Sequence, residues 1–171
     1  MSLVEIKPAS INDIQMIRHI AMCTWPATYY DILSSGQLAY MLSRMYSHAT
    51  LARQLQTGEQ QFLLAIQNGS PIGFAGFGPL DTNGSAITYK LHKLYVLPTI
   101  QKSGAGKRLL QEVEKLSKNC GASALLLNVN QSNNAYSFYT HMGFTIRNQV
   151  DLDIGNGFFM VDYVMEKRLE L

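Results

Sequence analysis

The hydrophobic residues in the first third of the chain recur mostly at helical spacing. A short apolar stretch at residues 3–7 predicts a strand, and Ser10 after it is a good N-cap for a helix. Apolar side chains then recur every three or four residues, which places them on one face of that helix. We expect the helix to end at Pro26 and two more short helices to follow it, over 38–45 and 48–56.

The period changes to two in the middle of the chain, as expected of strands. Two apolar runs, 61–67 and 72–77, flank Asn68 and Gly69, which favour the positive φ angles of a tight hairpin turn. A longer alternating run over 85–96 predicts a third strand. Together these segments predict an antiparallel meander.

Helix and strand patterns alternate in the last third of the chain. Residues 106–119 carry charged positions opposite apolar ones, which predicts an amphipathic helix. The remaining predictions are a strand over 124–129, a helix from 132 or 133 to 142, and strands over 144–149 and 159–169. Because the chain has no repeat, low-complexity tract or linker, we expect a single domain over 1–171, of the α+β class.

The composition is that of a globular domain with few charges. Of the 171 residues, 47% are hydrophobic and 15% are charged, against roughly 25% charged in an average domain. The net charge of +2 favours neither nucleic acid nor an acidic tail. This average hides a division, because residues 82–150 hold eight basic and two acidic residues while the rest holds six basic and ten acidic. The basic part would suit a ligand with several phosphates, and the acidic part a cationic one.

Neither a targeting segment nor a membrane span is expected. Glu5 and Asp13 interrupt what would be the apolar region of a signal peptide, and no apolar run approaches the roughly 18 residues of a span. Cys23 and Cys120 lie far apart without metal-ligand spacing, so we expect two reduced, partly buried thiols, with a disulfide or a nucleophile as the alternative. These features favour a soluble, cytoplasmic protein without a metal.

The segment 94–107 carries the strongest chemical signal. A strand ends at Pro98, a polar loop with two glycines follows, and an amphipathic helix begins directly after the loop. Glycines let backbone N–H groups approach a ligand, and a helix N-terminus adds unpaired donors and a partial positive charge, so this segment predicts an anion site. Lys102 and Lys107 would attract phosphate further.

Two common phosphate loops do not fit this segment. A P-loop requires a first glycine where this chain has Gln101, and a Ser or Thr where it has Arg108. A dinucleotide fingerprint requires a third glycine where Leu109 stands. The pattern Gln-x-x-Gly-x-Gly at 101–106, preceded by Leu-x-Val-x-Pro, instead resembles the acetyl-coenzyme A loop of the GNAT N-acetyltransferase superfamily.

The resemblance extends along nearly the whole chain. The segment 128–144 is similar to the family's strand, to its helix with Asn, Ala and a Phe-Tyr pair, and to its Gly-Phe strand start. The resemblance implies an α/β/α-layered acyl-CoA N-acyltransferase fold, with a mixed, mostly antiparallel sheet of six or seven strands flanked by helices. The region around Trp25 looks most like bacterial PaiA-type polyamine N-acetyltransferases.

Acetyl-coenzyme A is the cosubstrate that the resemblance implies. The strand before the loop would bind pantetheine through its backbone, and the loop would hold the pyrophosphate through N–H groups. The coenzyme-binding residues implied are Leu94, Tyr95, Val96, Gln101, Lys102, Ser103, Gly104, Ala105, Gly106, Lys107, Asn128, Asn133 and Tyr136. Surface solubility explains Lys102 equally well, Asn133 could simply cap the next helix, and Tyr136 could be a surface tyrosine.

Tyr139 and His92 are the catalytic candidates. In the resembling family a tyrosine at the position of Tyr139 donates a proton to the departing coenzyme thiolate; the alternative is a core aromatic beside Phe138. Many relatives carry Glu where this chain has His92, and a histidine with a pKa of about 6.5 could accept the proton of the amine. A half-buried structural histidine, with a water chain as the base, is the alternative.

The acceptor is expected to contact the segment around the end of the first helix. Trp25, Tyr29 and Asp31 could hold an amine by cation–π attraction and charge, although such aromatics are more often core residues. The resemblance therefore implies direct acetyl transfer from acetyl-coenzyme A to a primary amine, on a small molecule or polyamine, in a ternary complex. The alternatives are an acyl-coenzyme A-binding regulatory module with little turnover, and an acetyltransferase of protein N-termini or lysines. We expect no metal, nucleic-acid or membrane partner, and leave a homodimer open.

Overall fold

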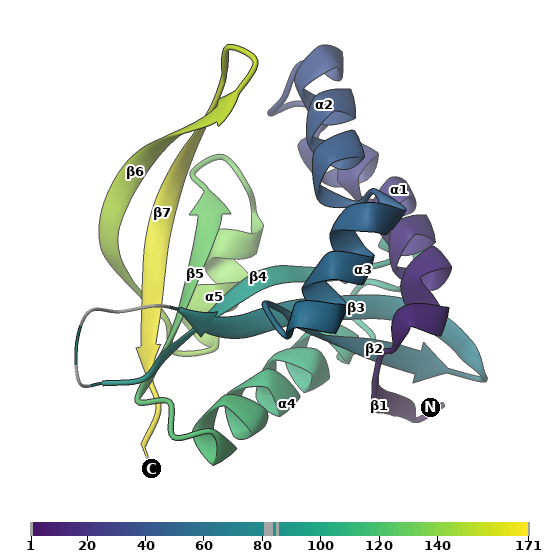
Figure 1. The fold of residues 1–171 in the computed structure, drawn as a ribbon, viewed down its shortest axis with the longest axis vertical. Helices are drawn as coiled ribbons and strands as arrows, with labels where there is room; N and C mark the ends of the chain where they lie inside the picture. The colour runs from purple at the N-terminus through teal and green to yellow at the C-terminus, as the bar shows by residue number, and fades with distance from the viewer. Residues whose placement is uncertain (1, 81–83, 85, 171) are drawn as a thin grey trace.

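In the part of the chain that the structure describes, residues 2–80, 84 and 86–170, seven strands form one sheet with helices on both faces (Figure 1). The coordinates are a computed structural model. The strands are β1 (Val4–Pro8), β2 (Gln61–Gln67), β3 (Ser70–Leu80), β4 (Thr88–Val96), β5 (Ala124–Asn130), β6 (Thr145–Gly155) and β7 (Phe158–Arg168). The helices are α1 (Ile14–Tyr29), α2 (Ser35–Met45), α3 (His48–Thr57), α4 (Ala105–Asn119) and α5 (Ala135–His141).

The sheet is mixed and mostly antiparallel, which confirms the predicted fold class. Its strand order is β1-β2-β3-β4-β5-β7-β6, and β4–β5 is the parallel pair among the described strands. These two strands pair only over 88–91 and 124–127. Beyond these residues they separate, while β5 stays paired with β7 as far as Asn130. The sheet is therefore split beside the second half of β4.

A β-bulge in β4 changes which residues face each side of the sheet. The register with β3 shifts after Gly76, which leaves His92 without a cross-strand partner. Strict alternation would place Leu91 and Tyr95 on the same face. The extra residue instead puts Leu91 and Leu94 in the core beside α4, and Tyr95 against the core beside α1. The bulge therefore decides which β4 side chains lie on each face of the sheet beside the split.

Each face of the sheet carries its own apolar core. On the α4 side, Leu109, Leu110 and Val113 are fully buried against the sheet. On the side of α1, α2 and α3, the core is built around Trp25 and Phe74. Figure 1 shows α4 on one face and α1 and α3 on the opposite face. The layered arrangement expected from the family resemblance is thus present.

Helix α1 continues past Pro26, although the sequence analysis expects it to end there. Proline lacks the N–H that would bond to the preceding turn, and it costs a helix most in its interior. Here Pro26 is exposed and stands in the last turn of α1. Trp25 and Tyr29 flank it and are both buried in the core on this face. Their packing holds the last turn in helical form and carries Tyr29 towards the split in the sheet.

Two predicted strand boundaries also move. The strand expected over 85–96 begins at Thr88, and Ser85 lies outside the described residues. Strand β6, expected over 144–149, runs on to Gly155 and forms a hairpin with β7. Most of its side chains are exposed, so it lacks the apolar alternation that would have revealed its length in the sequence.

The cysteines correct one further expectation. Cys23 and Cys120 are both exposed rather than partly buried, and neither is in a disulfide. None of the described helices has the length and apolar character needed to cross a membrane. Within the same residues there is no group of three or more His, Cys, Asp and Glu side chains that could hold a metal ion.

Candidate active site

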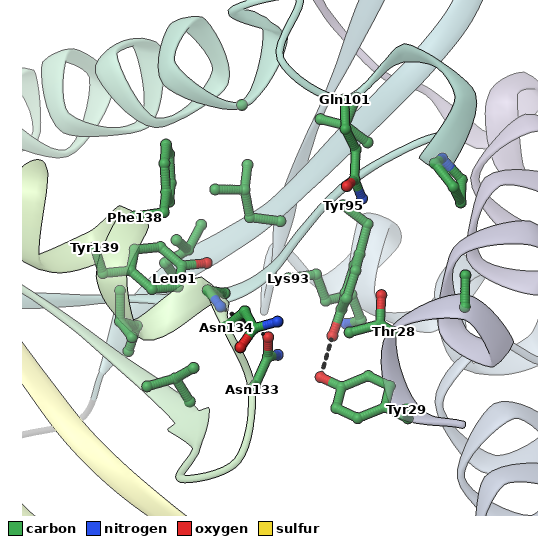
Figure 2. Close-up of a pocket in the computed structure, with 18 of the residues that line it drawn as sticks. Thr28, Tyr29, Leu91, Lys93, Tyr95, Gln101, Asn133, Asn134, Phe138 and Tyr139 are labelled. Carbon is green, nitrogen blue, oxygen red and sulfur yellow. Dashed lines mark hydrogen bonds between the residues drawn. The ribbon is translucent and has the colours of Figure 1, made fainter. Parts of the chain in front are cut away.

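A cavity of about 940 Å³ lies where β4 and β5 separate. Its wall comes from the end of α1, the second half of β4, the loop before α4, β5, and α5 with the segment that precedes it. Figure 2 shows side chains from these elements arranged around it. The predicted site residues that line it are Tyr29, Asp31, His92, Leu94, Tyr95, Val96, Gln101, Lys102, Ser103, Gly104, Ala105, Gly106, Lys107, Asn128, Asn133 and Tyr139.

Trp25 and Tyr136 are predicted site residues that do not line the cavity. Trp25 is 1% exposed, and its indole N–H donates to the Tyr46 hydroxyl at 3.2 Å. Its ring centre lies 4.7 Å from that of Tyr29, so it supports the cavity wall from behind rather than forming it. The Tyr136 ring packs against Tyr163 of β7, with their centres 5.5 Å apart. The structure therefore shows packing contacts for these two residues and no place in the cavity wall.

The second half of β4 presents a free backbone edge to the cavity. Leu94 and Val96 pair with β3 on one side, and among the described strands none pairs with them on the other. An extended ligand with amide groups can bond to such an edge as an added strand would. This geometry fits the pantetheine contacts expected at Leu94, Tyr95 and Val96.

The loop before α4 turns backbone amides towards the cavity. Lys102 has a φ of 72° and Gly104 a φ of 83°, both in the left-handed region. This conformation is strained for lysine, and backbone strain is concentrated at functional loops. At the start of α4, no side chain among the described residues caps the amides of Gly106 and Lys107. The helix N-terminus therefore has free donors for an anion.

Tyr139 lies on α5 with its hydroxyl directed towards the middle of the cavity (Figure 2). Its ring packs edge-on against Phe138 and Phe144, with centres 5.2 and 5.8 Å away. Burial raises the pKa of Tyr139 above its ordinary value of 10.0, and the nearby Tyr29 raises it further. The phenol therefore stays protonated near neutral pH and can donate a proton to a developing anion.

His92, the bulged residue of β4, is half-buried at the cavity wall. Burial lowers its pKa from 6.5 to about 3, with the positive charges of Lys90 and Lys93 contributing. The imidazole is therefore neutral at physiological pH but a far weaker base than an ordinary histidine. It is better suited to accepting a hydrogen bond than to becoming a cation.

Tyr29 of α1 and Tyr95 of β4 meet across the cavity wall. Their hydroxyl oxygens lie 3.2 Å apart (Figure 2). Burial raises the pKa of both phenols, so both remain protonated. Since the pair needs only one hydroxyl proton for its mutual hydrogen bond, the other can be offered to a ligand.

Asn133 caps the helix that follows it and also lines the cavity. Its side-chain oxygen accepts a hydrogen bond from the Ala135 amide at 2.9 Å, so it caps the start of α5. Hydrogen bonding from the same side chain lowers the pKa of Tyr29, which places Asn133 beside that hydroxyl at the cavity wall. Asn134, which was not predicted, lines the cavity next to it.

Lys93 is a cavity residue that the sequence reasoning missed. It is only 4% exposed, and its Nζ donates to Gln60 Oε1 at 2.8 Å and lies 5.2 Å from the centre of the Phe62 ring. Burial lowers its pKa from 10.5 to about 8. Alternation along β4 gives no sign of this position, because the bulge at His92 resets the faces.

The cavity as a whole joins an anion-binding end to an end lined by phenols. Free amides and exposed lysines stand at the loop, and the open edge of β4 leads away from it. The hydroxyls of Tyr29, Tyr95 and Tyr139 lie on the wall beyond. This arrangement suits an extended ligand that carries phosphates at one end and a reactive group at the other.

Comparison with known proteins identifies the same architecture elsewhere. Residues 32–167 match the model of a family described as acetyltransferase (GNAT) domain. A spermidine N(1)-acetyltransferase of Thermoplasma acidophilum is 29% identical in an alignment 172 positions long that covers 98% of each chain. An uncharacterized N-acetyltransferase of Bacillus subtilis, YuaI, is 26% identical over 80% of this chain and 78% of its own. The crystal structure of a PaiA N-acetyltransferase from Thermoplasma acidophilum in complex with coenzyme A has a TM-score of 0.81 at 28% identity, covering 97% of this chain and 99% of that chain.

Proposed function

This chain belongs to the GNAT family of acetyltransferases, and on that premise we propose that it transfers the acetyl group of acetyl-coenzyme A to a primary amine of a small molecule, with polyamines as the favoured class. The observation that carries the proposal is the continuous cavity. It runs from free amides at the start of α4, along the open edge of β4, to the protonated phenol of Tyr139. The spermidine acetyltransferase similar to this chain favours the polyamine class.

The coenzyme would lie with its pyrophosphate at the loop and its thioester near Tyr139. The amides of Gly106 and Lys107 would bind phosphate oxygens, and the left-handed turns at Lys102 and Gly104 keep the loop backbone open to them. The pantetheine arm would follow the β4 edge that lacks a neighbouring strand. The order of these contacts along the wall matches the order of the groups along the coenzyme.

Transfer of the acetyl group then requires three proton events. The acceptor ammonium loses a proton, and the free amine then attacks the thioester carbonyl. The attacking nitrogen loses a second proton as the intermediate collapses, and the departing coenzyme thiolate takes up a proton. Tyr139 would supply that last proton, because its buried phenol stays protonated. Its own proton would return from solvent after the product leaves.

His92 is poorly suited to act as the base that takes the proton of the acceptor ammonium. With a pKa of about 3, His92 does not become a cation near neutral pH. The proton of the ammonium would therefore pass to solvent water, and neutral His92 would orient that water or the amine through a hydrogen bond. This differs from a mechanism in which the strand residue itself carries the proton.

Release of coenzyme A in the presence of different amines tests the proposal. The panel contains spermidine and other polyamines, amino acids, aminoglycosides and peptides, each incubated with the protein and acetyl-coenzyme A. Free coenzyme A is quantified by chromatography, because the exposed Cys23 and Cys120 would themselves react with a thiol reagent. We expect polyamines to raise release well above hydrolysis. Background release with every amine would favour an acyl-coenzyme A-binding module, and release with peptides alone would favour a protein acetyltransferase.

A further inference from the structure

Asp162 of β7 is the buried carboxylate of this molecule. It is 5% exposed, and no other acidic side chain among the described residues is buried. Its Oδ1 has no hydrogen-bond partner, and it takes part in none of the ion pairs within the described residues. A carboxylate oxygen removed from water without a partner is costly to the fold, and such an atom is expected where it serves a ligand.

The strand pairing places Asp162 on the same face of the sheet as a residue of the cavity wall. Asp162 is opposite Asn130 of β5, and residues opposite one another in an antiparallel pair share a face. Asn128 is two residues away on β5, so it lies on that same face, and it lines the cavity. Burial raises the pKa of Asp162 above its ordinary value, while hydrogen bonding from Asn128 and the charge of Lys90 act in the opposite direction and favour the carboxylate. Asp162 does not itself line the cavity, and Asn128 connects it to the cavity wall.

The negative charge of Asp162 acts on a residue of the cavity wall. Its charge contributes to the raised pKa of Tyr29, whose hydroxyl is on the opposite wall. Lys90 of β4 is the cation that faces Asp162, and each charge stabilises the other, although they form no ion pair at contact distance. Asp31, the acidic residue on the cavity wall itself, is exposed to water, which screens its charge. The buried charge of Asp162 is therefore the stronger attraction for a cation inside the cavity.

We propose that Asp162 binds the positive charge of the acceptor, whose ammonium group lies between Asn128 and Tyr29. This inference rests on the proposed function and assigns the acceptor site to the side of the split formed by β5 and β7. The charge of Asp162 attracts the cation from behind Asn128, which both hydrogen-bonds to the carboxylate and lines the cavity. Acceptors that carry a positive charge are selected over neutral ones of the same shape.

Calorimetric binding of spermidine to the protein saturated with coenzyme A tests this assignment without requiring turnover. Asp162→Asn keeps the side-chain shape and removes the charge. We expect it to weaken spermidine binding by about 10-fold, the size expected for a buried charge that attracts the cation without touching it. The affinity for coenzyme A should stay unchanged, because the pyrophosphate loop and the β4 edge lie on the other side of the cavity. Asp162→Ser is the second neutral variant, for use if Asp162→Asn does not fold.

Asp151→Asn is the matched control. Asp151 lies on the neighbouring strand β6, is exposed, and is opposite Val161, which places it on the other face of the sheet from Asp162. The control removes the same charge and should leave spermidine binding unchanged. Equal spermidine affinity in the wild type and Asp162→Asn, with only a lower melting temperature, would overturn the inference and make Asp162 a structural partner of Lys90. Absence of spermidine binding by the wild type would overturn it too, whereas a wild type that binds spermidine without acetylating it would contradict the proposed function alone.

Discussion

The hydroxyls of Tyr29 and Tyr95 lie 3.2 Å apart and connect the last turn of α1 to the bulged half of β4. The helix and strand boundaries predicted from the sequence do not bring these two residues together. Tyr29 reaches the cavity because α1 continues past Pro26, and Tyr95 reaches it because the bulge at His92 resets the alternation of β4. A proline inside a helix and a bulge in a strand thus together produce one contact in the wall of the site.

Replacement of Tyr29 by Phe should weaken this contact selectively. The change removes one hydroxyl from the pair and leaves the ring packed against Trp25. We expect a loss of about 1 kcal/mol in the free energy of unfolding, the usual magnitude for one hydrogen bond, and a higher KM for the amine. Urea unfolding and steady-state kinetics measure the two effects. Tyr30→Phe is the control, because Tyr30 is 81% exposed and should tolerate the change without either effect.

Tyr139→Phe should lower kcat by a factor on the order of 100 or more, since it removes the proton donor for the coenzyme thiolate. The ring keeps its contacts with Phe138 and Phe144, so stability and the affinity for acetyl-coenzyme A should hold. Tyr136→Phe on the same helix is the matched control, because Tyr136 does not line the cavity. Equal kcat in both variants would remove Tyr139 from the chemistry.

Gly104→Ala should weaken acetyl-coenzyme A binding. Gly104 has a φ of 83°, and an alanine strains this conformation even though nothing lies within 4 Å of its added carbon. The strain should cost about 1 kcal/mol and move the loop amides away from the phosphates. Gly58→Ala provides the same test of strain far from the site, with a φ of 73° and equally open space. Both variants should lose similar stability, and calorimetry should show reduced coenzyme affinity in Gly104→Ala only.

The free energy of unfolding should decrease as the pH falls from about 6.5 towards 3, and His92 should contribute to this decrease. Its folded pKa of about 3 lies below the unfolded value of 6.5. Between these values the unfolded chain binds a proton that the folded chain does not, so acidification favours unfolding. His92→Gln should make the pH dependence shallower in that window, as measured by urea unfolding at a series of pH values. An identical pH dependence in the variant would show that His92 titrates normally in the folded state.

Sequence reasoning is most successful where function depends on residues close together along the chain. Short motifs fix the local structure of the loop at 101–107 and of the helix that carries Tyr139, and the structure brings both to one cavity. The sequence does not decide the role of Trp25, since an aromatic on α1 can line a cavity or pack behind its wall, and only the structure shows that it packs behind. Lys93 and Asp162 were missed because their places depend on a bulge and on the pairing of β7 with β5, which are tertiary features.

The central claim is that this cavity carries an acetyl group from coenzyme A to a polyamine. Mass spectrometry of spermidine, after incubation with the protein and acetyl-coenzyme A that carries an isotope label in its acetyl group, tests it most directly. The account predicts labelled N-acetylspermidine, formed in equal amount to free coenzyme A and nearly absent with Tyr139→Phe. Release of coenzyme A with only labelled acetate, and no labelled amine, would contradict it.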